Sequence, residues 1–546
     1  MREYELKKMW IRRALDSAAL TSTDRSAVAE FLASLDGMHS VHVELNKFPG
    51  AFWRAILREA QLPVTTRTGI ALHVFGIRQS DCNLDSIYEL EVADPVEFGV
   101  SLQLSGSRSP NCEMQLNGRW YPVVATIRFI EDGDKVTRGV ELRCAVQLGD
   151  RAFGVGHMVS RDLFLDEASE KRTVKVIEVL ERLGYQRLMM TATEFNLRLV
   201  SAERMAASFG KVVLVTGSVI APSRFSWWKG FETQSLGSPE MPSRCVVEPA
   251  LEVDHDHRYM FSRDDESESR LPFVRIFCLE TKSYVYADID DITEYQFDTE
   301  ALTRLQLPAD MHSILRRVFS TPIENMFGDL LQGKHGGAVV LASGEPGVGK
   351  TLTAEIYAEI TERPLYVLEL GELGTRASEV EENLQCVFAR VTRWNAVLQF
   401  DECEIFLAQR GNDLERSAIV GIFLRLLDYY RGLLFLTTNR PEVLDDAVLS
   451  RVMLRLQYPR LDAHTRAMIW KTMFEVAGLH LQECSFEKLG GVDLNGRQIR
   501  NLTRLARILF PDGFVNKAGI RDVLRFGCGS SLDGHKDSHN ETPNGN

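Results

Sequence analysis

The stretch Gly344-Glu-Pro-Gly-Val-Gly-Lys-Thr351 decides the fold of the C-terminal half of this chain. It follows the short apolar run Ala338-Val-Val-Leu-Ala342 and leads into Leu352-Thr-Ala-Glu-Ile-Tyr-Ala-Glu-Ile360, which has the composition of a helix. In a G-x-x-x-x-G-K-T loop between a strand and a helix, glycines let backbone N–H groups face phosphate oxygens, and the helix N-terminus adds a positive dipole. The sequence therefore predicts a phosphate-binding loop in an α/β fold.

The residues of this loop have separate expected tasks. Lys350 is expected to reach the β- and γ-phosphates, and Thr351 is expected to hold a magnesium ion. The predicted cofactors are accordingly ATP and Mg²⁺. The residues of this segment that we expect to bind ATP are Gly344, Glu345, Pro346, Gly347, Val348, Gly349, Lys350, Thr351 and Leu352.

Two later apolar strands are predicted to end at the same site. The segment Asn395-Ala-Val-Leu-Gln-Phe-Asp-Glu402 closes with two carboxylates and is interrupted only by Gln399. Asp401 can orient the metal through water, and Glu402 can position the attacking water. The segment Leu433-Leu-Phe-Leu-Thr-Thr-Asn439 ends in an amide that can hold that water or the γ-phosphate. In a doubly wound sheet such strand ends meet over the phosphates.

The order of these motifs, followed by Leu444-Asp-Asp-Ala-Val-Leu-Ser-Arg451, resembles the AAA branch of the AAA+ ATPases over about residues 300–525. The resemblance implies that Asn439 is the sensor-1 residue. It also implies that Arg451 is an arginine finger acting on a neighbouring subunit, with Arg455 a second candidate, and that the chain assembles with itself into a ring, expected to be hexameric. The implied catalytic residues are Lys350, Glu402, Asn439 and Arg451, and the implied metal-site residues are Thr351 and Asp401.

After Pro459 the pattern becomes helical, and it resembles the small helical lid of the same family. Arg497, in the predicted helix from Gly496 to Leu509, matches the sensor-2 position and is a further expected ATP-binding residue. The four arginines of this helix are equally consistent with a solvated face. More loosely, residues 170–525 resemble a group of poorly characterised microbial and fungal AAA proteins that share a long N-terminal region.

The N-terminal half alternates between helical and strand patterns. Residues 1–36 are predicted to form one or two helices with Thr23 as an N-cap, and Asp132-Gly133 is a hairpin signal in the β-rich part that follows. Arg263–Arg270 is predicted to be a solvated loop. We therefore expect an N-terminal helix plus β-rich domain (1–165), a mixed α/β domain (166–300), a large P-loop ATPase domain with a parallel sheet flanked by helices (301–460), a helical lid (461–527) and a disordered tail (528–546).

Composition excludes several classes of protein. The 546 residues carry a formal net charge of −13, which disfavours a surface dedicated to nucleic acid. There is no hydrophobic signal segment and no run of about 18 apolar residues, so a cytoplasmic protein without a membrane partner is predicted. The nine cysteines include no C-x-x-C pair, which argues against a zinc site.

Three segments of the sequence bear on what the predicted motor acts on. Peptide-threading relatives carry an aromatic pore loop where this chain has Leu370–Glu379, which contains no aromatic residue. Arg224-Phe-Ser-Trp-Trp-Lys229 is a basic and aromatic patch, and Asp254-His-Asp-His257 is a weak metal candidate. The preferred function is an ATP-hydrolysing ring that remodels a protein assembly recognised by the N-terminal region. The alternatives are a nucleotide-switched binding scaffold and a nucleic-acid-associated motor.

Overall fold

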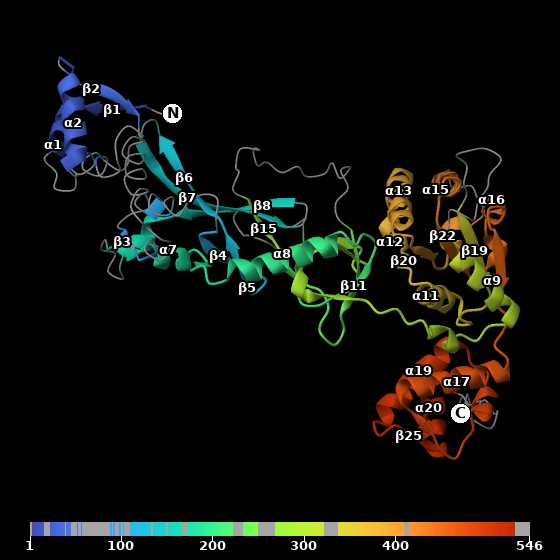
Figure 1. Ribbon diagram of the computed structural model, residues 1–546. Helices are drawn as coiled ribbons and strands as arrows, with labels where there is room; N and C mark the ends of the chain where they lie inside the picture. Colours follow the sequence, from blue (N-terminus) through green and yellow to red (C-terminus); the bar gives the residue numbers. More distant parts are fainter. Residues whose placement is uncertain are drawn as a thin grey trace, which may run out of the picture. The chain divides into compact units, whose positions relative to one another are not determined.

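The computed structural model forms two compact units, Met1–Phe209 with Val213–Thr293, and Gly210–Val212 with Glu294–Asn546. Figure 1 shows the helices and strands of both. The structure describes residues 3–15, 22–35, 40–44, 110–132, 135–148, 151–165, 172–221, 233–248, 268–321, 337–408 and 414–529, with single residues and short pieces between 37 and 102. The segments 224–229 and 254–257, singled out above, and the predicted tail from 530 onward lie outside these ranges.

The first unit consists mainly of antiparallel strands. Its helices are α1 (Lys8–Leu15), α2 (Ser22–Ser34), η2 (Arg161–Phe164), α7 (Val176–Arg182), α8 (Ala192–Ala206) and η4 (Ile289–Asp291). Its strands are β1 (Glu3–Lys7), β2 (Ser40–Glu44), β3 (Glu91–Val92), β4 (Cys112–Leu116), β5 (Arg119–Val123), β6 (Ala125–Asp132), β7 (Lys135–Leu148), β8 (Arg151–Val159), β9 (Val174–Lys175), β10 (Tyr185–Gln186), β11 (Val212–Val215), β12 (Ser218–Ile220), β13 (Thr233–Ser235), β14 (Ser243–Val247), β15 (Glu268–Leu271), β16 (Phe273–Cys278), β17 (Ser283–Asp288) and β18 (Ile292–Glu294).

Two sheets dominate this unit. One has seven strands in the order β13-β12-β17-β16-β14-β11-β18, and the other has the order β15-β7-β6 with β8 paired to β7. In β7 the side chains of Val140, Leu142, Cys144, Val146 and Leu148 are buried at every second position, as expected for a strand with one face on a core. Asp132 pairs with Lys135 across the β6–β7 connection, where a hairpin was predicted.

Three local predictions for the N-terminal half are wrong. Glu3–Lys7 is not helical but forms β1, which pairs with β2 antiparallel. Helix α2 begins at Ser22, so Thr23 lies inside the helix rather than at its N-cap. The polar run ending at Arg270 is not all loop, because Glu268–Leu271 forms β15 in parallel with β7. Backbone pairing holds β15 whatever its side chains, and buried Ser269 accepts a hydrogen bond from the Val124 N–H at 2.7 Å.

The second unit begins with a five-stranded parallel sheet. Its strands are β19 (Ala338–Ser343), β20 (Leu365–Leu368), β21 (Val397–Phe400), β22 (Leu433–Thr438) and β23 (Leu454–Gln457) in the order β20-β21-β22-β19-β23. The connecting helices are η5 (Ala301–Arg304), α9 (Ala309–Ser320), α11 (Lys350–Ile360), α12 (Leu370–Leu373), α13 (Ala377–Arg393), α14 (Glu404–Leu407), α15 (Leu414–Leu427), η6 (Pro441–Val443) and α16 (Asp446–Leu449).

Helices cover both faces of this sheet (Figure 1). On one face Phe319 of α9 and Tyr357 of α11 pack in the same core as Phe435 of β22. On the other face Phe423 of α15 contacts both Phe400 of β21 and Phe388 of α13. Because both faces are covered, β19 and β22 are continuous apolar runs, as is usual in parallel sheets. The predicted α/β fold of a parallel sheet flanked by helices is confirmed.

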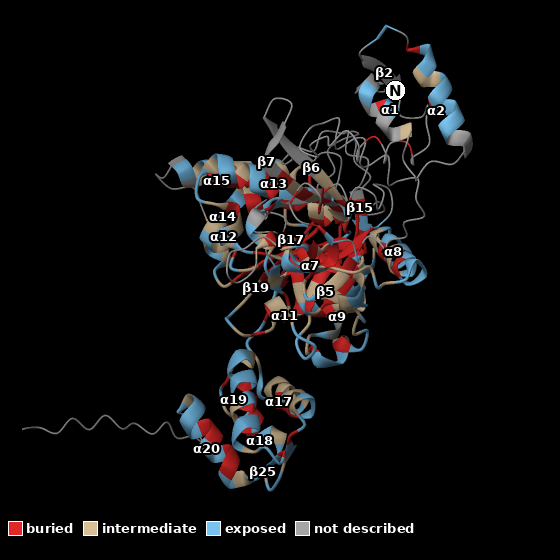
Figure 2. Ribbon diagram, turned by 90° about the vertical axis from the view of Figure 1, so that its left-hand side faces the viewer, coloured by how far each residue is buried: buried red, intermediate tan, exposed pale blue. Residues whose placement is uncertain are grey.

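A small helical part follows the sheet. It contains α17 (Ala463–Ala477), α18 (Phe486–Gly490), α19 (Gly496–Leu509), α20 (Lys517–Cys528) and the short strands β24 (His480–Leu481) and β25 (Phe514–Val515). Trp470, Phe474 and Ile499 are among the fully buried residues of its own core, and Figure 2 shows buried residues along the inner sides of these helices. Asn495 caps α19 by accepting the Gln498 N–H at 2.9 Å, so the helix begins at the edge of the nucleotide loop described next.

Candidate active site

The loop between β19 and α11 has the backbone that a phosphate-binding loop needs. Gly344, Gly347 and Gly349 all have positive φ angles, of 149°, 79° and 103°. A Cβ on Gly347 would lie 2.8 Å from the Asn495 side chain, and one on Gly344 would lie 2.7 Å from the Tyr458 carbonyl oxygen. Only glycine fits these positions without strain or displacement of a neighbour. The glycine spacing in the sequence is therefore explained by backbone geometry.

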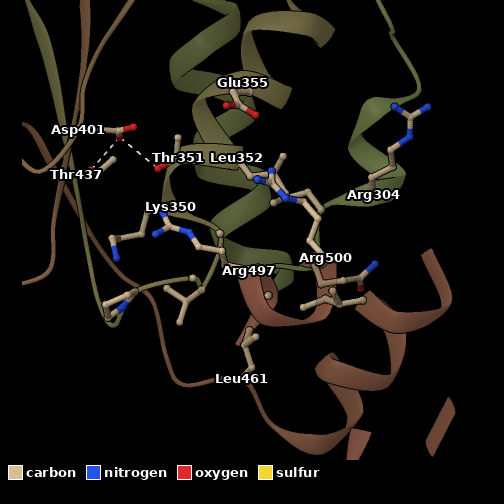
Figure 3. A pocket seen from close by; sticks show the side chains of 18 of the residues that line it. Arg304, Lys350, Thr351, Leu352, Glu355, Asp401, Thr437, Leu461, Arg497 and Arg500 are labelled. Atoms are coloured by element: carbon tan, nitrogen blue, oxygen red, sulfur yellow. Dashed lines mark hydrogen bonds between the residues drawn. The ribbon is translucent and has the colours of Figure 1, made fainter. Parts of the chain in front are cut away.

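A cavity of about 390 Å³ opens above this loop (Figure 3). Its polar wall contains the loop from Pro346 to Leu352 together with Asp401, Glu402, Thr437 and Asn439. The lining also includes the apolar residues Leu305, Leu461, Ile469 and Met473 and the arginines Arg304, Arg497 and Arg500. A cavity lined by both polar and apolar side chains suits a ligand with a phosphate chain and a planar base.

Lys350 lies at the centre of the polar wall. Its ammonium group donates to the carbonyl oxygens of Gly344 and Glu345, both at 2.8 Å, and to Asn439 Oδ1 at 2.9 Å. Burial lowers the pKa of Lys350, and the carboxylates of Glu404 and Asp401 oppose this effect. All three hydrogens are thus aimed at neutral oxygens, and a phosphate would give this partly buried cation an anionic partner.

Asp401 and Glu402 occupy the end of β21 in different environments. Asp401 Oδ1 accepts hydrogen bonds from Thr437 at 2.9 Å, Gln399 at 2.9 Å and Thr351 at 3.2 Å. The Glu402 side chain is exposed and lines the cavity, and its backbone has a φ of 51°. Left-handed backbone at a non-glycine residue is uncommon and gathers at functional sites. Asp401 is held in place, while Glu402 is open to the cavity.

The start of α19 meets the nucleotide loop directly. The Gly496 N–H donates to the Gly347 carbonyl oxygen at 2.8 Å. Arg497 and Arg500 follow on the same helix, and both are exposed in the cavity wall (Figure 3). Arg497, an expected ATP-binding residue, thus lines the cavity, and so does Arg500, whose spacing of three residues puts it on the same helical face.

Arg451 lies away from the cavity of its own chain. Its guanidinium donates to both oxygens of Asp428, at 2.7 and 3.0 Å, and to the Ala447 carbonyl oxygen at 3.0 Å. Arg455, the second finger candidate, donates to the Leu449 carbonyl oxygen at 2.7 Å. The remaining predicted residues come together at the loop, except that the Glu345 side chain turns to Arg460 at 2.6 Å.

Several residues at this site were not predicted from the sequence. Thr437 and Glu404 gave no signal of their own, because each reaches the site only after distant segments have folded together. Arg500 could have been found from its spacing of three residues from Arg497. Gln399 did give a signal, since it is a polar residue in the middle of an apolar strand. Glu404 accepts the Asn439 N–H at 3.3 Å and is the carboxylate that most strongly offsets the lowered pKa of Lys350.

Comparison with known proteins agrees with this geometry. Residues 340–460 match the family described as "ATPase family associated with various cellular activities (AAA)". The chain is similar to "ATPase family gene 2 protein homolog B" of Homo sapiens, with 36% identity over 118 residues, covering 20% of this chain and 16% of that protein. It is also similar to "Fidgetin-like protein 1" of Homo sapiens, with 32% identity over 141 residues, covering 24% of this chain and 21% of that protein.

Residues 340–460 thus match an AAA ATPase domain, which confirms the family expected for this part of the chain from its motifs. The matches span only about a fifth of the chain and about a sixth to a fifth of these relatives. None of the helices in the described ranges combines the length and the apolar character needed to span a membrane. Within those ranges, no group of three or more His, Cys, Asp or Glu side chains is arranged to hold a metal ion.

Proposed function

We propose that this chain binds ATP at the β19–α11 loop and hydrolyses it between Lys350 and Glu402. The observation that carries the proposal is the convergence of Lys350, Thr351, Asp401, Glu402 and Asn439 on one cavity from three separate strand ends. Parallel strands that share an edge bring such ends together, and this arrangement suits in-line attack on a terminal phosphate.

The chain's own groups then have distinct parts. Loop backbone N–H groups and Lys350 bind the β- and γ-phosphates, and the apolar wall at Leu305, Ile469 and Met473 takes the base. Glu402 orients a water molecule and accepts its proton as that water attacks the γ-phosphorus. Asn439, held by Lys350, contacts the γ-phosphate or the water. Arg497 and Arg500 add positive charge as the leaving diphosphate forms.

The oxygen ligands of this site fit magnesium. The Thr351 hydroxyl and the Asp401 carboxylate are 3.2 Å apart, and hard oxygen donors of this kind suit Mg²⁺ that keeps several waters and binds phosphate oxygens. When bound, the ion would neutralise charge on the phosphates. Phosphate oxygens and water would supply the remaining ligands.

A second copy of the chain is proposed to complete the site with its Arg451. In its own chain this residue is paired with Asp428, outside the cavity that holds Lys350. A finger of this kind supplies positive charge to the transition state and is worth roughly 10³ to 10⁵ in rate in other phosphoryl-transfer enzymes. The resulting ring, which we propose to be hexameric, would couple ATP hydrolysis to the remodelling of a protein assembly held by the N-terminal region.

The test of hydrolysis is Glu402→Gln. The expected result is a loss of ATPase rate of roughly 10² to 10⁴ with ATP binding retained, because the amide cannot accept the proton of the attacking water. A variant that turns over ATP at the wild-type rate would show that Glu402 is not the catalytic carboxylate.

The test of the shared site mixes two inactive variants. Arg451→Ala lacks the finger and Lys350→Ala lacks nucleotide contacts, so a mixed ring contains some intact sites in which a Lys350→Ala subunit lends its finger to an Arg451→Ala neighbour. Partial recovery of ATPase activity is expected. Mixtures as inactive as either variant alone would contradict the shared site.

The client is tested with the same trapped variant. Full-length Glu402→Gln held in ATP should retain a protein that wild-type chain in ADP releases, and truncation before the ATPase domain identifies which part holds it. Stimulation of the ATPase by DNA or RNA, rather than by a protein, would replace the client class proposed here.

A further inference from the structure

Two buried polar side chains lie behind the carboxylate end of β21. Gln399 is completely buried in a central strand, between β20 and β22, and Thr437 at the end of β22 is 2% exposed. The register pairs Phe400 with Leu436, so Asp401 follows directly opposite Thr437. Gln399 and Asp401, two residues apart, face the same side of the sheet. Both polar groups are therefore aimed at one carboxylate.

The hydrogen bonds at Asp401 are uneven. Its Oδ1 receives three, from Gln399 Nε2, Thr437 Oγ and Thr351 Oγ, while its Oδ2 receives none from the described residues. Three donors on one oxygen fix the rotation of the carboxyl group. Figure 3 shows two of these bonds, from Thr351 and Thr437. The second oxygen is left for a ligand.

The Thr437 hydroxyl also reaches the neighbouring catalytic residue. It donates its hydrogen to Asp401 and accepts the Glu402 N–H at 3.1 Å, at the residue whose φ is 51°. One hydroxyl therefore joins the two carboxylate residues and holds the turn that exposes the Glu402 side chain.

The Gln399 side chain is energetically unfavourable in the sheet core. A carboxylate only accepts hydrogen bonds, so the amide must turn its nitrogen toward Asp401, which points Gln399 Oε1 the other way. This Oε1 is buried and has no hydrogen-bond partner among the described residues. An unsatisfied buried oxygen destabilises a fold, and an apolar residue would suit this strand better. A functional reason for the amide is therefore needed.

We infer that Gln399 and Thr437 are positioning residues that hold Asp401 Oδ1 so that Oδ2 faces the magnesium shell of the bound nucleotide. The inference rests on the proposed function and names two groups that act through Asp401, of which Gln399 is fully buried and does not line the cavity. Partners that orient a ligating carboxylate typically change metal affinity or activity by roughly 10- to 100-fold when removed. Substituting either residue should therefore weaken metal binding and leave the binding of metal-free nucleotide unchanged.

The test measures Mn²⁺ bound with ADP to the full-length chain, from the electron paramagnetic resonance signal of free Mn²⁺. Thr437→Val should raise the half-saturating Mn²⁺ concentration by roughly tenfold or more, and Thr437→Ser should restore it to within about twofold. ADP binding in EDTA should stay at the wild-type level. The matched control is Thr438→Val, since Thr438 is equally buried but its hydroxyl accepts only the Arg440 N–H.

Gln399→Met provides a second and independent arm. It should weaken Mn²⁺ binding in the same way while leaving the melting temperature without ligands unchanged or higher, because the unpartnered oxygen is gone. Wild-type Mn²⁺ affinity in Thr437→Val and in Gln399→Met would overturn the inference. If the variants show these Mn²⁺ effects but the wild-type chain does not hydrolyse Mg²⁺-ATP, the inference stands and the proposed hydrolysis is refuted.

Discussion

The two units of this protein use charged residues in opposite ways. In the ATPase unit Glu402 is exposed in a cavity, and Lys350, although buried, also lines it. In the N-terminal unit Asp288 is 1% exposed and has side-chain partners from two other elements, α8 and β5. The Asp288 carboxylate accepts hydrogen bonds from Arg198 of α8, at 2.7 and 2.8 Å, and from the hydroxyl of Tyr121 of β5. Next to it, Arg119 donates to Asp291. Charged groups thus line a cavity in one unit, where we propose that they act on ATP, and join elements in the other.

This contrast explains why the structure of the ATPase half is easier to predict from sequence than that of the N-terminal half. A catalytic loop requires particular residues at fixed spacing, so its pattern is visible in the linear sequence. The Asp288 cluster combines residues up to 172 positions apart, and no local pattern marks it.

The largest effect is expected for Asp288→Ala. Removing this carboxylate leaves the largely buried Arg198 without its main partner, and breaking buried pairs typically costs about 3–5 kcal/mol. Hydrogen exchange should show faster opening of peptides from β16, β17 and α8, with protection of the ATPase sheet unchanged. Asp290→Ala is the matched control, because half-exposed Asp290 pairs with the same arginine and should cost less than about 1 kcal/mol. Equal effects of the two substitutions would remove the distinction between the units.

Gly347→Ala should act on nucleotide binding rather than on the fold. At a φ of 79° an alanine is strained, and its Cβ would meet Asn495 at 2.8 Å. A strain of about 1–2 kcal/mol corresponds to a loss of ATP affinity of roughly tenfold. Titration with a fluorescent ATP analogue measures it. Gly371→Ala, with an ordinary backbone angle and nothing within 4 Å of the added Cβ, should bind like the wild type.

A smaller effect is expected for Asp428→Asn. The amide still receives one hydrogen bond from Arg451 but loses the charge that holds the guanidinium in place. Pairs this exposed contribute about 0.2–1 kcal/mol, so the ATPase rate should fall by roughly two- to fivefold with ATP affinity unchanged. Asp446→Asn, an exposed acid one helix away, serves as the control. A fall in ATP affinity would mean that Asp428 affects its own site rather than the finger.

The smallest effect concerns pH. Burial lowers the pKa of His157 in β8 below its usual 6.5. The unfolded chain therefore takes up this proton first, and the N-terminal unit should lose stability as the pH falls below about 6.5 toward the lower folded pKa. Urea midpoints at pH 7.5 and 5.5, followed by hydrogen exchange in β7 and β8, measure the loss. His157→Gln should flatten this part of the profile, and an unchanged profile would show that the imidazole does not contribute.

The sequence was sufficient for the ATPase sheet, its strand ends and the loop glycines, because continuous apolar strands and fixed motif spacing are local properties. It was insufficient for β1 and β15, whose charged residues hide strands that are held by backbone pairing. The threonine and the amide behind Asp401 were also missed as a pair, since their meeting depends on the register of β21 against β22.

Gly347 and Gly496 meet backbone to backbone at 2.8 Å, and a Cβ on Gly496 would also lie 2.8 Å from the Gly347 carbonyl oxygen. This backbone contact joins the first turn of α19 directly to the loop that we propose to bind phosphates. Any rotation of the lid must therefore pull on the loop at once. We expect nucleotide exchange and movement of the helical lid (α17 to α20) to occur at the same rate. A partner that binds the lid and restricts its movement would then slow ADP release.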